Sequence, residues 1–261
     1  DSFVFIDDSP RECEAVNQIL PEVEVVQVPE KLHQFPQILF KSGLFDTLSV
    51  TTEDGKRTQL YQEDSTRKAH HIKTGDLKAY LESLEMVATI HTIKEAEIQR
   101  VSQLTQKTNQ FNLTTKRYSK SDIDSFIASS TTIIFSLSVA DKFGDLGLTG
   151  VFIAHKKETA IIIDSFLLSC RILGRNLEYL FIDNCINLVH EKWKIEQWRA
   201  SFIPTQKNQQ VSTFWPKLGF HPVENSETGS DYQMTFQQKI NQNFTYITVK
   251  MECKKRRGYI I

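Results

Sequence analysis

The sequence predicts an α/β protein, in which a mixed sheet flanked by helices follows a single strand–helix–strand unit. Two observations support this fold class. Apolar, β-branched runs of strand length alternate with segments whose apolar residues recur at helical spacing. The chain has 261 residues, of which 40% are hydrophobic and 24% are charged. This is the composition of an ordinary globular chain with room for one large or two modest domains.

The first 28 residues predict the strand–helix–strand unit. An apolar run at residues 3–6 is typical of a strand buried in a parallel sheet. Ser9 and Pro10 supply an N-cap and a first-turn residue for a helix through Leu20, and residues 23–28 predict the second strand. Such a unit cannot bury both of its faces, and the chain begins on a buried-type strand without Met. We therefore expect a piece of a longer protein.

The remaining chain predicts a connector, a second domain and a tail. Residues 1–29 are expected to be the last part of an α/β domain, residues 30–85 a polar helical connector, residues 86–252 one domain, and residues 253–261 a basic tail. The element order predicted after Met86 is βααβββαβαββ. Its strands are predicted at 87–93, 133–139, 148–154, 160–166, 198–203, 232–238 and 244–251, and its helices at 95–108, 121–127, 174–192 and 208–218.

The turn between the fourth of these strands and the long helix carries the strongest functional signal. It contains Arg171, Gly174, Arg175 and Asn176. The first N–H groups of a helix have no internal partner and lie at the positive end of its dipole. Glycine lets the backbone approach a ligand closely. The turn is therefore predicted to cradle a pyrophosphate, with charge supplied by the two arginines.

A thiol, Cys170, lies in the same turn and has two interpretations. A free cysteine is most often a small buried hydrophobe. Alternatively, it is a nucleophile that carries an acyl group as a thioester, its thiolate favoured by Arg171 and the helix N-terminus. The residues alone do not decide between these interpretations.

Composition excludes several classes of partner. The formal net charge of −1 gives no general attraction to nucleic acid or to an anionic membrane. The basic run at residues 254–257 is interpreted as a solvated tail. No apolar run is long enough to span a bilayer. The four cysteines contain no C-x-x-C pair, which predicts a reducing compartment, the cytoplasm, and no zinc site.

The element order and the Arg-x-x-Gly-x-Asn turn resemble the GNAT acyltransferase fold. The segment from Asn208 to Phe220 is similar to that family's Asn-x-x-Ala-x-x-x-Tyr-x-x-x-Gly-Phe helix. The resemblance implies that the N–H groups of residues 174–176 hold phosphate oxygens and that Asn208 binds a pantetheine arm. Two departures are Asn176, where Gly or Ala is usual, and Trp215, where many acetyltransferases carry a Tyr that protonates the departing thiolate. An indole N–H is a donor only.

A closer similarity is to the FkbH-like family, whose members join a HAD phosphatase-like domain to a GNAT-like domain. It rests on residues 100–118, 143–145 and 169–175, and on residues 5–10, which resemble the last acidic motif of HAD phosphatases. The resemblance implies transfer of a glyceryl-type acyl unit from a small phosphorylated three-carbon donor to the phosphopantetheine thiol of an acyl carrier protein in polyketide-type biosynthesis. CoA is the alternative carrier.

The same resemblance implies a Mg²⁺ site at Asp7 and Asp8 in the intact HAD-like domain. Paired carboxylates at the end of a strand suit a hard cation, although a helix N-cap with a solvated neighbour explains them equally simply. The Asp-x-Asp-x-Thr motif that holds the HAD nucleophile is absent from this sequence. We therefore expect phosphatase-like chemistry to belong to a missing N-terminal half.

An amide-rich string after the helix at 95–108 is predicted to contact the substrate, because a GNAT fold builds its acceptor site there. The alternative is a capped helix end. Asp145, in a Gly/Asp turn, is a further candidate. The predicted substrate contacts are Thr108, Asn109, Gln110, Asn112 and Asp145. Two other functions stay open: a non-catalytic module that docks the carrier protein, and an ordinary CoA-dependent N-acetyltransferase.

Overall fold

The computed structural model describes residues 3–20, 23–29, 31–41, 43–44, 57–226, 229–236, 244–252, 255–256 and 259–260. The chain forms two compact units, Asp1–Thr52 and Glu53–Ile261. Each unit is described by itself. The domain boundaries expected from the sequence at residues 29 and 85 stay predictions.

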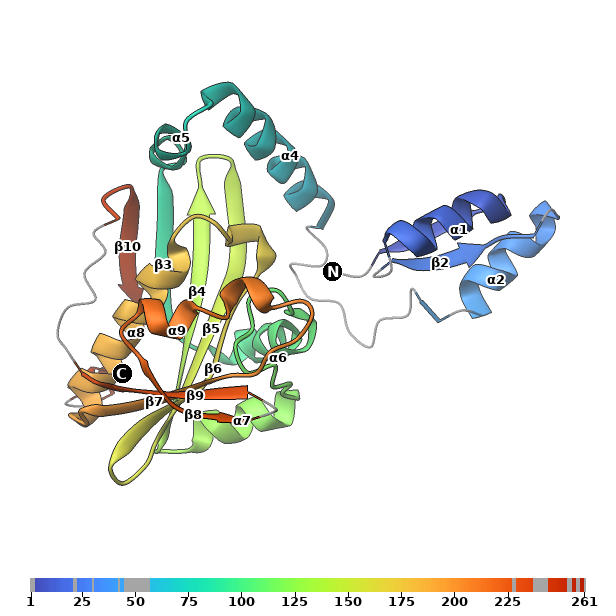
Figure 1. The fold of residues 1–261 in the computed structure, drawn as a ribbon. Coiled ribbons are helices and arrows are strands. Elements are labelled where there is room, and N and C mark those ends of the chain that lie inside the picture. Colours follow the sequence, from blue (N-terminus) through green and yellow to red (C-terminus); the bar gives the residue numbers. More distant parts are fainter. Residues whose placement is uncertain are drawn as a thin grey trace. The chain divides into compact units, whose positions relative to one another are not determined.

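The first unit contains the predicted strand–helix–strand arrangement (Figure 1). Strand β1 runs parallel to β2, with Phe5 opposite Val25. The Ser9 hydroxyl accepts a hydrogen bond from the Glu12 N–H (3.4 Å), and Pro10 occupies the first turn of the intervening helix. Its elements are β1 (Val4–Asp7), α1 (Pro10–Ile19), β2 (Glu24–Gln27), the 3₁₀ turn η1 (Leu32–Gln34) and α2 (Phe35–Lys41).

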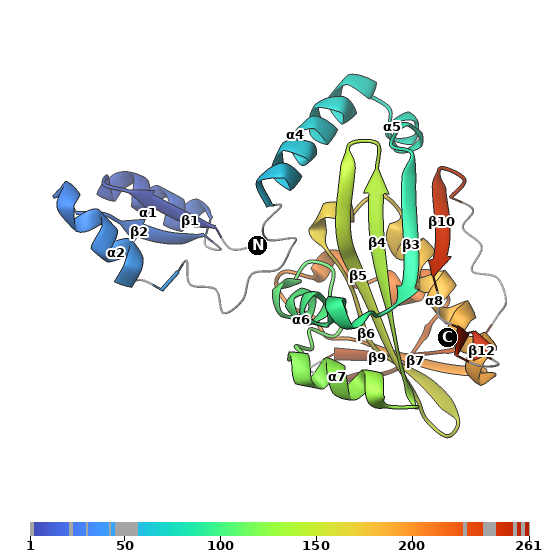
Figure 2. The ribbon, with the colours of Figure 1, turned by 180° about the vertical axis from the view of Figure 1, so that it is seen from behind.

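The second unit is built on an eight-stranded mixed sheet in the order β10-β3-β4-β5-β6-β7-β9-β8 (Figures 1 and 2). Strands β3 to β6 are antiparallel, β6 and β7 are parallel, and β10 joins β3 in parallel at one edge. The strands are β3 (Met86–Thr92), β4 (Thr132–Asp141), β5 (Gly144–Lys156), β6 (Ala160–Leu168), β7 (Gln197–Phe202), β8 (His221–Ser226), β9 (Gly229–Thr235) and β10 (Ile247–Glu252). A separate antiparallel pair is formed by β11 (Lys255–Arg256) and β12 (Tyr259–Ile260).

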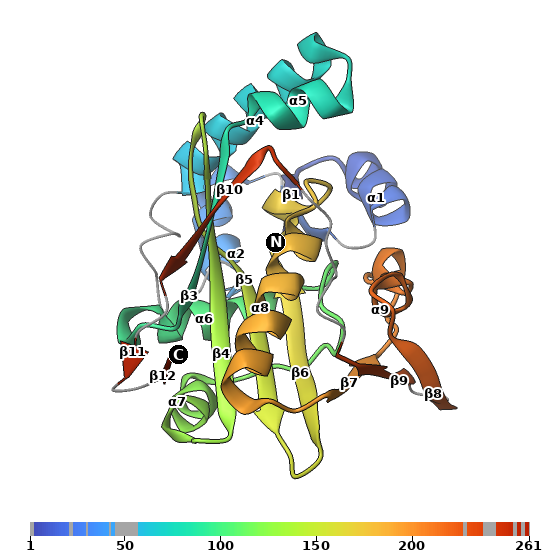
Figure 3. The same cartoon turned by 90° about the vertical axis from the view of Figure 1, so that its left-hand side faces the viewer.

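Helices cover both faces of this sheet, as the predicted fold class requires. Figure 3 shows α8 on one side of the central strands and α6 and α7 on the other. Two apolar clusters match the two faces: one contains Phe181 and Ile186 of α8, and the other contains Val101 of α6 and Ile123 of α7. The helices are α4 (Arg57–Thr74), α5 (Leu77–Ser83), α6 (Ile98–Lys107), α7 (Lys120–Ala128), α8 (Leu177–Trp193) and α9 (Phe214–Lys217); the short 3₁₀ turns are η2 (Glu95–Glu97), η3 (Cys170–Ile172) and η4 (Gln209–Val211).

Two expectations about the C-terminal elements were wrong. The helix predicted at 208–218 is divided into η4 and the four-residue α9. Pro216 has no N–H to donate, and in one continuous helix its ring would collide with the carbonyl of Ser212, so Pro216 is tolerated only in the first turn of a new helix, α9. The sequence pattern also missed β8. This strand contains Pro222 and lies at the edge of the sheet, the one place where a strand tolerates proline.

The parallel strands β6 and β7 separate at the centre of the sheet. They pair only from Ala160 to Ile163, although β6 continues to Leu168. At the same level, β6 contains a bulge: Ile163 and Ser165 face consecutive residues of β5, which leaves Asp164 as the extra residue. The separation of β6 and β7 therefore begins at Asp164.

A short segment from the α6–α7 connection occupies the space between the two strands. The Leu168 N–H donates to the Phe111 carbonyl (3.0 Å), and the Leu113 N–H donates to the Phe166 carbonyl (3.3 Å). On the other side, the Ile203 N–H donates to the Leu113 carbonyl (2.8 Å). This segment therefore joins the ends of β6 and β7 through its backbone.

Candidate functional site

The turn between β6 and α8 has the backbone of an anion-binding cradle. Gly174 (φ 75°) and Asn176 (φ 64°) are both left-handed, and α8 begins at the next residue. A Cβ added at Gly174 would meet no atom within 4 Å, so the turn opens into free space. Within the described ranges, no backbone carbonyl accepts from the N–H groups of residues 174–176. Three free donors at the positive end of a helix suit a phosphate group.

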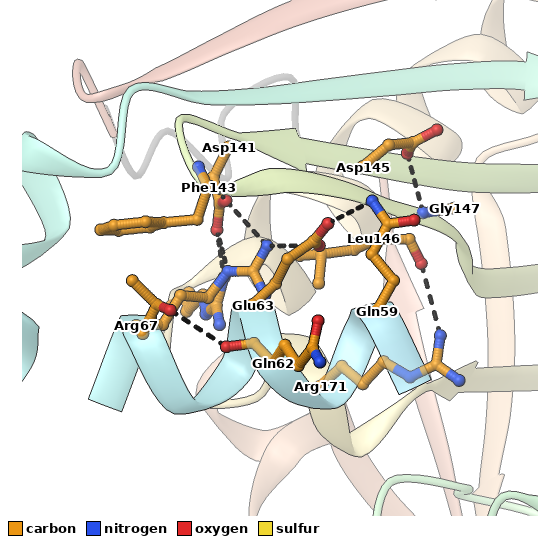
Figure 4. Close-up of polar contacts among 12 residues, drawn as sticks. Gln59, Gln62, Glu63, Arg67, Asp141, Phe143, Asp145, Leu146, Gly147 and Arg171 are labelled. Atoms are coloured by element: carbon orange, nitrogen blue, oxygen red, sulfur yellow. Dashed lines mark hydrogen bonds and ion pairs between the residues drawn. The ribbon is translucent and has the colours of Figure 1, made fainter. Parts of the chain in front are cut away.

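The side chain of Arg175 enters a buried ionic network behind the cradle. Its Nη1 lies 3.1 Å from Oδ2 of Asp141, at the end of β4. The same carboxylate receives two hydrogen bonds from Arg67 of α4, from Nε (2.7 Å) and from Nη2 (2.9 Å). Asp141 is fully buried and Arg67 is 1% exposed. The network thus connects α4 to the β4–β5 hairpin (Figure 4) and, through Arg175, to the turn that forms the cradle.

This network balances its charges. Glu63, one turn before Arg67, lies 3.5 Å from its Nη2 and adds a second carboxylate. Burial by itself lowers the pKa of Arg67, but hydrogen bonding to Asp141 and the charges of both carboxylates raise that pKa above its ordinary value. Because Arg175 already neutralises Asp141, the cradle would hold an anion mainly through its N–H groups. The charge that Arg175 was predicted to supply to a ligand stays a prediction.

The thiol of Cys170 is exposed at the beginning of η3. The guanidinium of Arg171, which was expected to stabilise a thiolate, donates to the carbonyl of Leu146 on β5 (3.5 Å). Asp145 lies in β5, opposite Ala140, and accepts from the Gly147 N–H (2.8 Å) of the same strand (Figure 4). The exposed position shows that Cys170 is not a buried hydrophobe, and its role as a nucleophile stays a prediction.

Two of the predicted ligand-binding amides are bonded within the fold. Asn208 is fully buried; its Oδ1 accepts from the Thr205 N–H (2.7 Å), and its Nδ2 donates to the carbonyls of Ile203 (2.9 Å) and Asn112 (3.0 Å). The Asn112 side chain donates to the Thr108 carbonyl (3.3 Å) and accepts from the Thr115 N–H (2.9 Å). These amides hold the loop after β7 against the segment between β6 and β7. Their contact with a ligand stays a prediction.

The predicted substrate contacts diverge in the structure. Asn109 accepts from the Arg117 guanidinium (2.5 Å) and lines a cavity with it. The Gln110 carbonyl accepts from the Gln210 side chain (3.4 Å), and the Thr108 carbonyl accepts from Arg117 (2.9 Å). The amide-rich string therefore builds a loop, and Asn109 is the member of the string that lines the cavity.

The sequence analysis missed a buried carboxylate at the separation of β6 and β7. Asp164 is 6% exposed. Its carboxylate accepts from Lys116 Nζ (2.5 Å) and the Tyr118 hydroxyl (2.6 Å), and His155 Nε2 lies 3.7 Å away. Burial raises its pKa, but the hydrogen bonds from His155, Lys116 and Tyr118 lower it well below the usual range. An aspartate inside the apolar run from Ile161 to Phe166 was the signal available in the sequence.

Because Asp164 stays charged, it acts as an anchor rather than as a proton acceptor. Burial and the neighbouring Asp164 raise the pKa of Tyr118, so this phenol stays neutral and donates its hydrogen bond. The cluster fixes residues 116–118 against β6. Trp215 is also committed to the fold: it is 1% exposed, and its Nε1 donates to the Ser201 carbonyl (3.0 Å).

The first unit offers no assembled metal site among its described residues. The Asp7 carboxylate accepts from the Ser9 N–H (2.8 Å), an interaction typical of a strand-to-helix turn, and Asp8 is exposed. In the described parts of the chain, no three histidine, cysteine, aspartate or glutamate side chains are arranged so that they could hold a metal ion. The Mg²⁺ assignment for the intact domain stays a prediction. Among the helices described, none combines the length and apolar character needed to cross a bilayer.

Several solved structures with a similar chain arrangement are named as acetyltransferases. The ribosomal-protein-S18-alanine N-acetyltransferase of Escherichia coli is 10% identical (TM-score 0.43), and the alignment covers 60% of this chain and 97% of that one. The PaiA N-acetyltransferase of Thermoplasma acidophilum, in complex with coenzyme A, is 11% identical (TM-score 0.44; 57% and 99% covered). An acetyltransferase of Thermus thermophilus is 13% identical (TM-score 0.45; 59% and 99% covered). No family model and no curated protein matches the chain.

Proposed function

We propose that the second unit is an acyltransferase whose acyl group is carried as a pantetheine thioester, on CoA or on an acyl carrier protein. The observation that carries this proposal is the turn at residues 174–176. It presents three backbone N–H groups without protein acceptors among the described residues, next to open space and at the beginning of α8. A phosphate of the carrier is the group that such a helix end binds best.

The acyl acceptor at this site is proposed to be a thiol. A general acid is needed to protonate a departing thiolate when the acceptor is an amine. Trp215, which replaces the usual tyrosine, is buried and bonded to a backbone carbonyl. Exchange between thiol and thioester is nearly isoenergetic, so it needs no strong acid. The exposed Cys170, in the same turn as the cradle, is proposed as the thiol that first receives the acyl group.

The finer proposal follows the resemblance to the FkbH-like family. The phosphorylated three-carbon donor is itself an acyl phosphate, with a phosphate bonded to its carbonyl carbon, and is bound with the help of the HAD-like half. The Cys170 thiolate attacks its carbonyl carbon, the carbon–sulfur bond forms, and inorganic phosphate leaves. The thiolate of a carrier protein's phosphopantetheine then attacks this thioester, takes the glyceryl group and releases Cys170 as a thiolate. Both steps balance without a redox partner.

Binding of CoA by the intact chain tests the cradle. The variant Gly174→Ala would place a methyl group where the phosphate must approach. The matched control is Gly75→Ala in the α4–α5 turn, because Gly75 has a similar φ (71° against 75°) and likewise nothing within 4 Å. Both variants should lose about 1 kcal/mol of stability. Only Gly174→Ala should weaken CoA binding, by about tenfold in calorimetric titration, since a hydrogen bond to a charged group is lost.

Product analysis with the full-length protein tests the chemistry. The protein is incubated with the phosphorylated donor and the holo carrier protein, and enzyme and carrier are weighed by mass spectrometry. A glyceryl adduct on wild type that is lost in Cys170→Ser supports the covalent route. Carrier loading without any enzyme adduct would identify a docking module. Acetylation of an amine from acetyl-CoA, unaffected by Cys170→Ser, would identify an ordinary N-acetyltransferase of the kind named for the similar structures.

A further inference from the structure

An open cavity of about 280 Å³, lined by residues with polar or charged side chains, lies between the connection that follows α6 and the loop that follows β7. Its wall has two cationic side chains and no carboxylate. The lining residues are Asn109, Thr115, Arg117, Thr205, Gln206 and Lys207. We propose that this cavity binds an oxyanion, the phosphate or carboxylate group of a small molecule. That this small molecule is the second substrate of acyl transfer rests on the proposed function.

Arg117 is held in place with part of its donor capacity unused. Its Nη1 donates to the carbonyls of Thr105 and Thr108, and its Nη2 donates to Oδ1 of Asn109. A guanidinium has five N–H donors, so these three bonds leave two for a ligand. The three bonds fix the plane of the group, and a fixed guanidinium loses little freedom when it binds an oxyanion.

Both walls of the cavity are positioned by buried polar groups. Lys116 and Tyr118 bind Asp164, so the alternate residues Thr115 and Arg117 line the cavity. On the facing wall, the buried Asn208 binds the Thr205 N–H, and the same side chain crosses to the carbonyl of residue 112. The two walls are therefore held at a set separation before any ligand arrives.

The remaining lining groups suit a small anionic group. Lys207 has an exposed side chain without a protein partner in the described structure, and its backbone N–H donates to the Thr205 hydroxyl oxygen (3.3 Å). The hydroxyl proton of Thr205 is therefore available to an acceptor in the cavity. The volume lies just below the range for drug-sized ligands, about 300–1,000 Å³, and fits one functional group of a ligand better than a whole cofactor.

Site-resolved NMR of the whole chain tests this proposal. Sodium phosphate, sodium acetate and sodium chloride are titrated at constant ionic strength, and the backbone amide shifts of Thr115, Thr205 and Lys207 report the cavity. The amide shifts of Gly174 and Arg175 report the cradle separately. Lys207→Met removes one charge from the cavity, and Lys157→Met removes one from the exposed β5–β6 turn as a matched control.

Phosphate or acetate, but not chloride, should shift the cavity amides with a saturable curve. Lys207→Met should weaken this binding by about fivefold, and Lys157→Met should leave it unchanged. Tighter binding of phosphate would identify the ligand group as a tetrahedral phosphate, and tighter binding of acetate would identify it as a planar carboxylate. Absence of saturable shifts at these amides, or equal effects of the two variants, would overturn the proposal. Arg117→Lys keeps the charge but loses the planar set of N–H donors of the guanidinium, and it should also weaken binding. CoA titration of the same samples shows independently whether the cradle fails.

Discussion

Asp141 is the residue on which the site depends most. Its carboxylate is the shared partner of Arg67 and Arg175, and neither arginine has appreciable exposure to water. Removing one partner of a buried ion pair lowers the stability of the fold by more than the intact pair contributes to it, because the remaining charge stays desolvated. The contact therefore matters less as a source of stability than as a fixed connection between α4 and the cradle.

Replacing Asp141 with Asn should destabilise the protein by about 3–5 kcal/mol, since Arg175 would be left without a carboxylate and Arg67 would keep only Glu63. Chemical denaturation measures this loss. The control is Asp64→Asn, which breaks an exposed pair with Lys68 (2.9 Å) on the same helix and should cost less than about 1 kcal/mol. Similar losses in the two variants would show that the buried network is relaxed in solution.

The carboxyl group of Asp183 on α8 makes stability depend on pH. Burial raises its pKa to about 6. The folded state therefore retains a proton that the unfolded state releases at lower pH, and the stabilisation that is complete at pH 3 disappears as pH rises through 6.

Asp183→Asn removes the carboxylate, whose burial in its charged form lowers the stability of the folded state above pH 6. The variant should be more stable than wild type by about 1 kcal/mol at pH 7.5, a figure reduced for partial exposure to solvent, and the difference should vanish near pH 3. Thermal unfolding of both proteins across this pH range provides the measurement. A difference in stability that is the same at all pH values would show that the substitution acts through packing and not through the ionisation of Asp183.

At the scale of elements, Asn208 joins the loop after β7 to the segment between β6 and β7. Its amide satisfies two carbonyls and one N–H of the backbone. This arrangement explains how a segment with no regular structure can fill the separation of two parallel strands. The Leu168 and Ile203 N–H groups and the Phe166 carbonyl find backbone partners in this segment.

Asn208→Ala should lower the free energy of unfolding by about 2–4 kcal/mol, because three backbone groups lose their partner in a buried place. Asn184→Ala on α8 removes one bond, to the Leu180 carbonyl (2.8 Å), and should cost less than about 1 kcal/mol. Urea denaturation compares the two. In the Asn208 variant, hydrogen exchange should also increase at Leu113 and Ile203. Unchanged exchange there would contradict the role of Asn208 as a connection.

At the scale of the whole molecule, the apolar core belongs to the second unit. Both hydrophobic clusters contain only residues from Tyr80 onward. Among the described hydrophobic residues of the first unit, Cys13 and Val28 are the buried ones. The compact unit Glu53–Ile261 therefore holds what is needed for cooperative folding.

A chain that starts at residue 53 should unfold at the same temperature as the whole protein, within about 2 °C, because no member of either core cluster is removed. Calorimetry of the two chains measures the difference. A fall of more than about 5 °C would show that the first unit contributes core contacts to the second.

Local patterns in the sequence were sufficient for much of the fold. The strand–helix–strand unit, the order of elements from Met86 to β7 and the cradle turn each follow from patterns in consecutive residues. The positive φ of Gly174 and the apolar spacing of α8 are properties of a few neighbouring positions. Where a local rule was overlooked, at Pro216, the predicted helix was wrong.

The contacts that complete the site depend on which distant segments become neighbours. Arg67 and Asp141 are 74 residues apart in sequence, and Asn208 and Asn112 are 96 residues apart. No periodicity marks such pairs, because a hydrogen bond between them exists only after the sheet has brought its strands into register. The sequence by itself determined the elements and the cradle. The tertiary structure alone decided which charges it buries, what fills the gap between β6 and β7, and where the polar cavity opens.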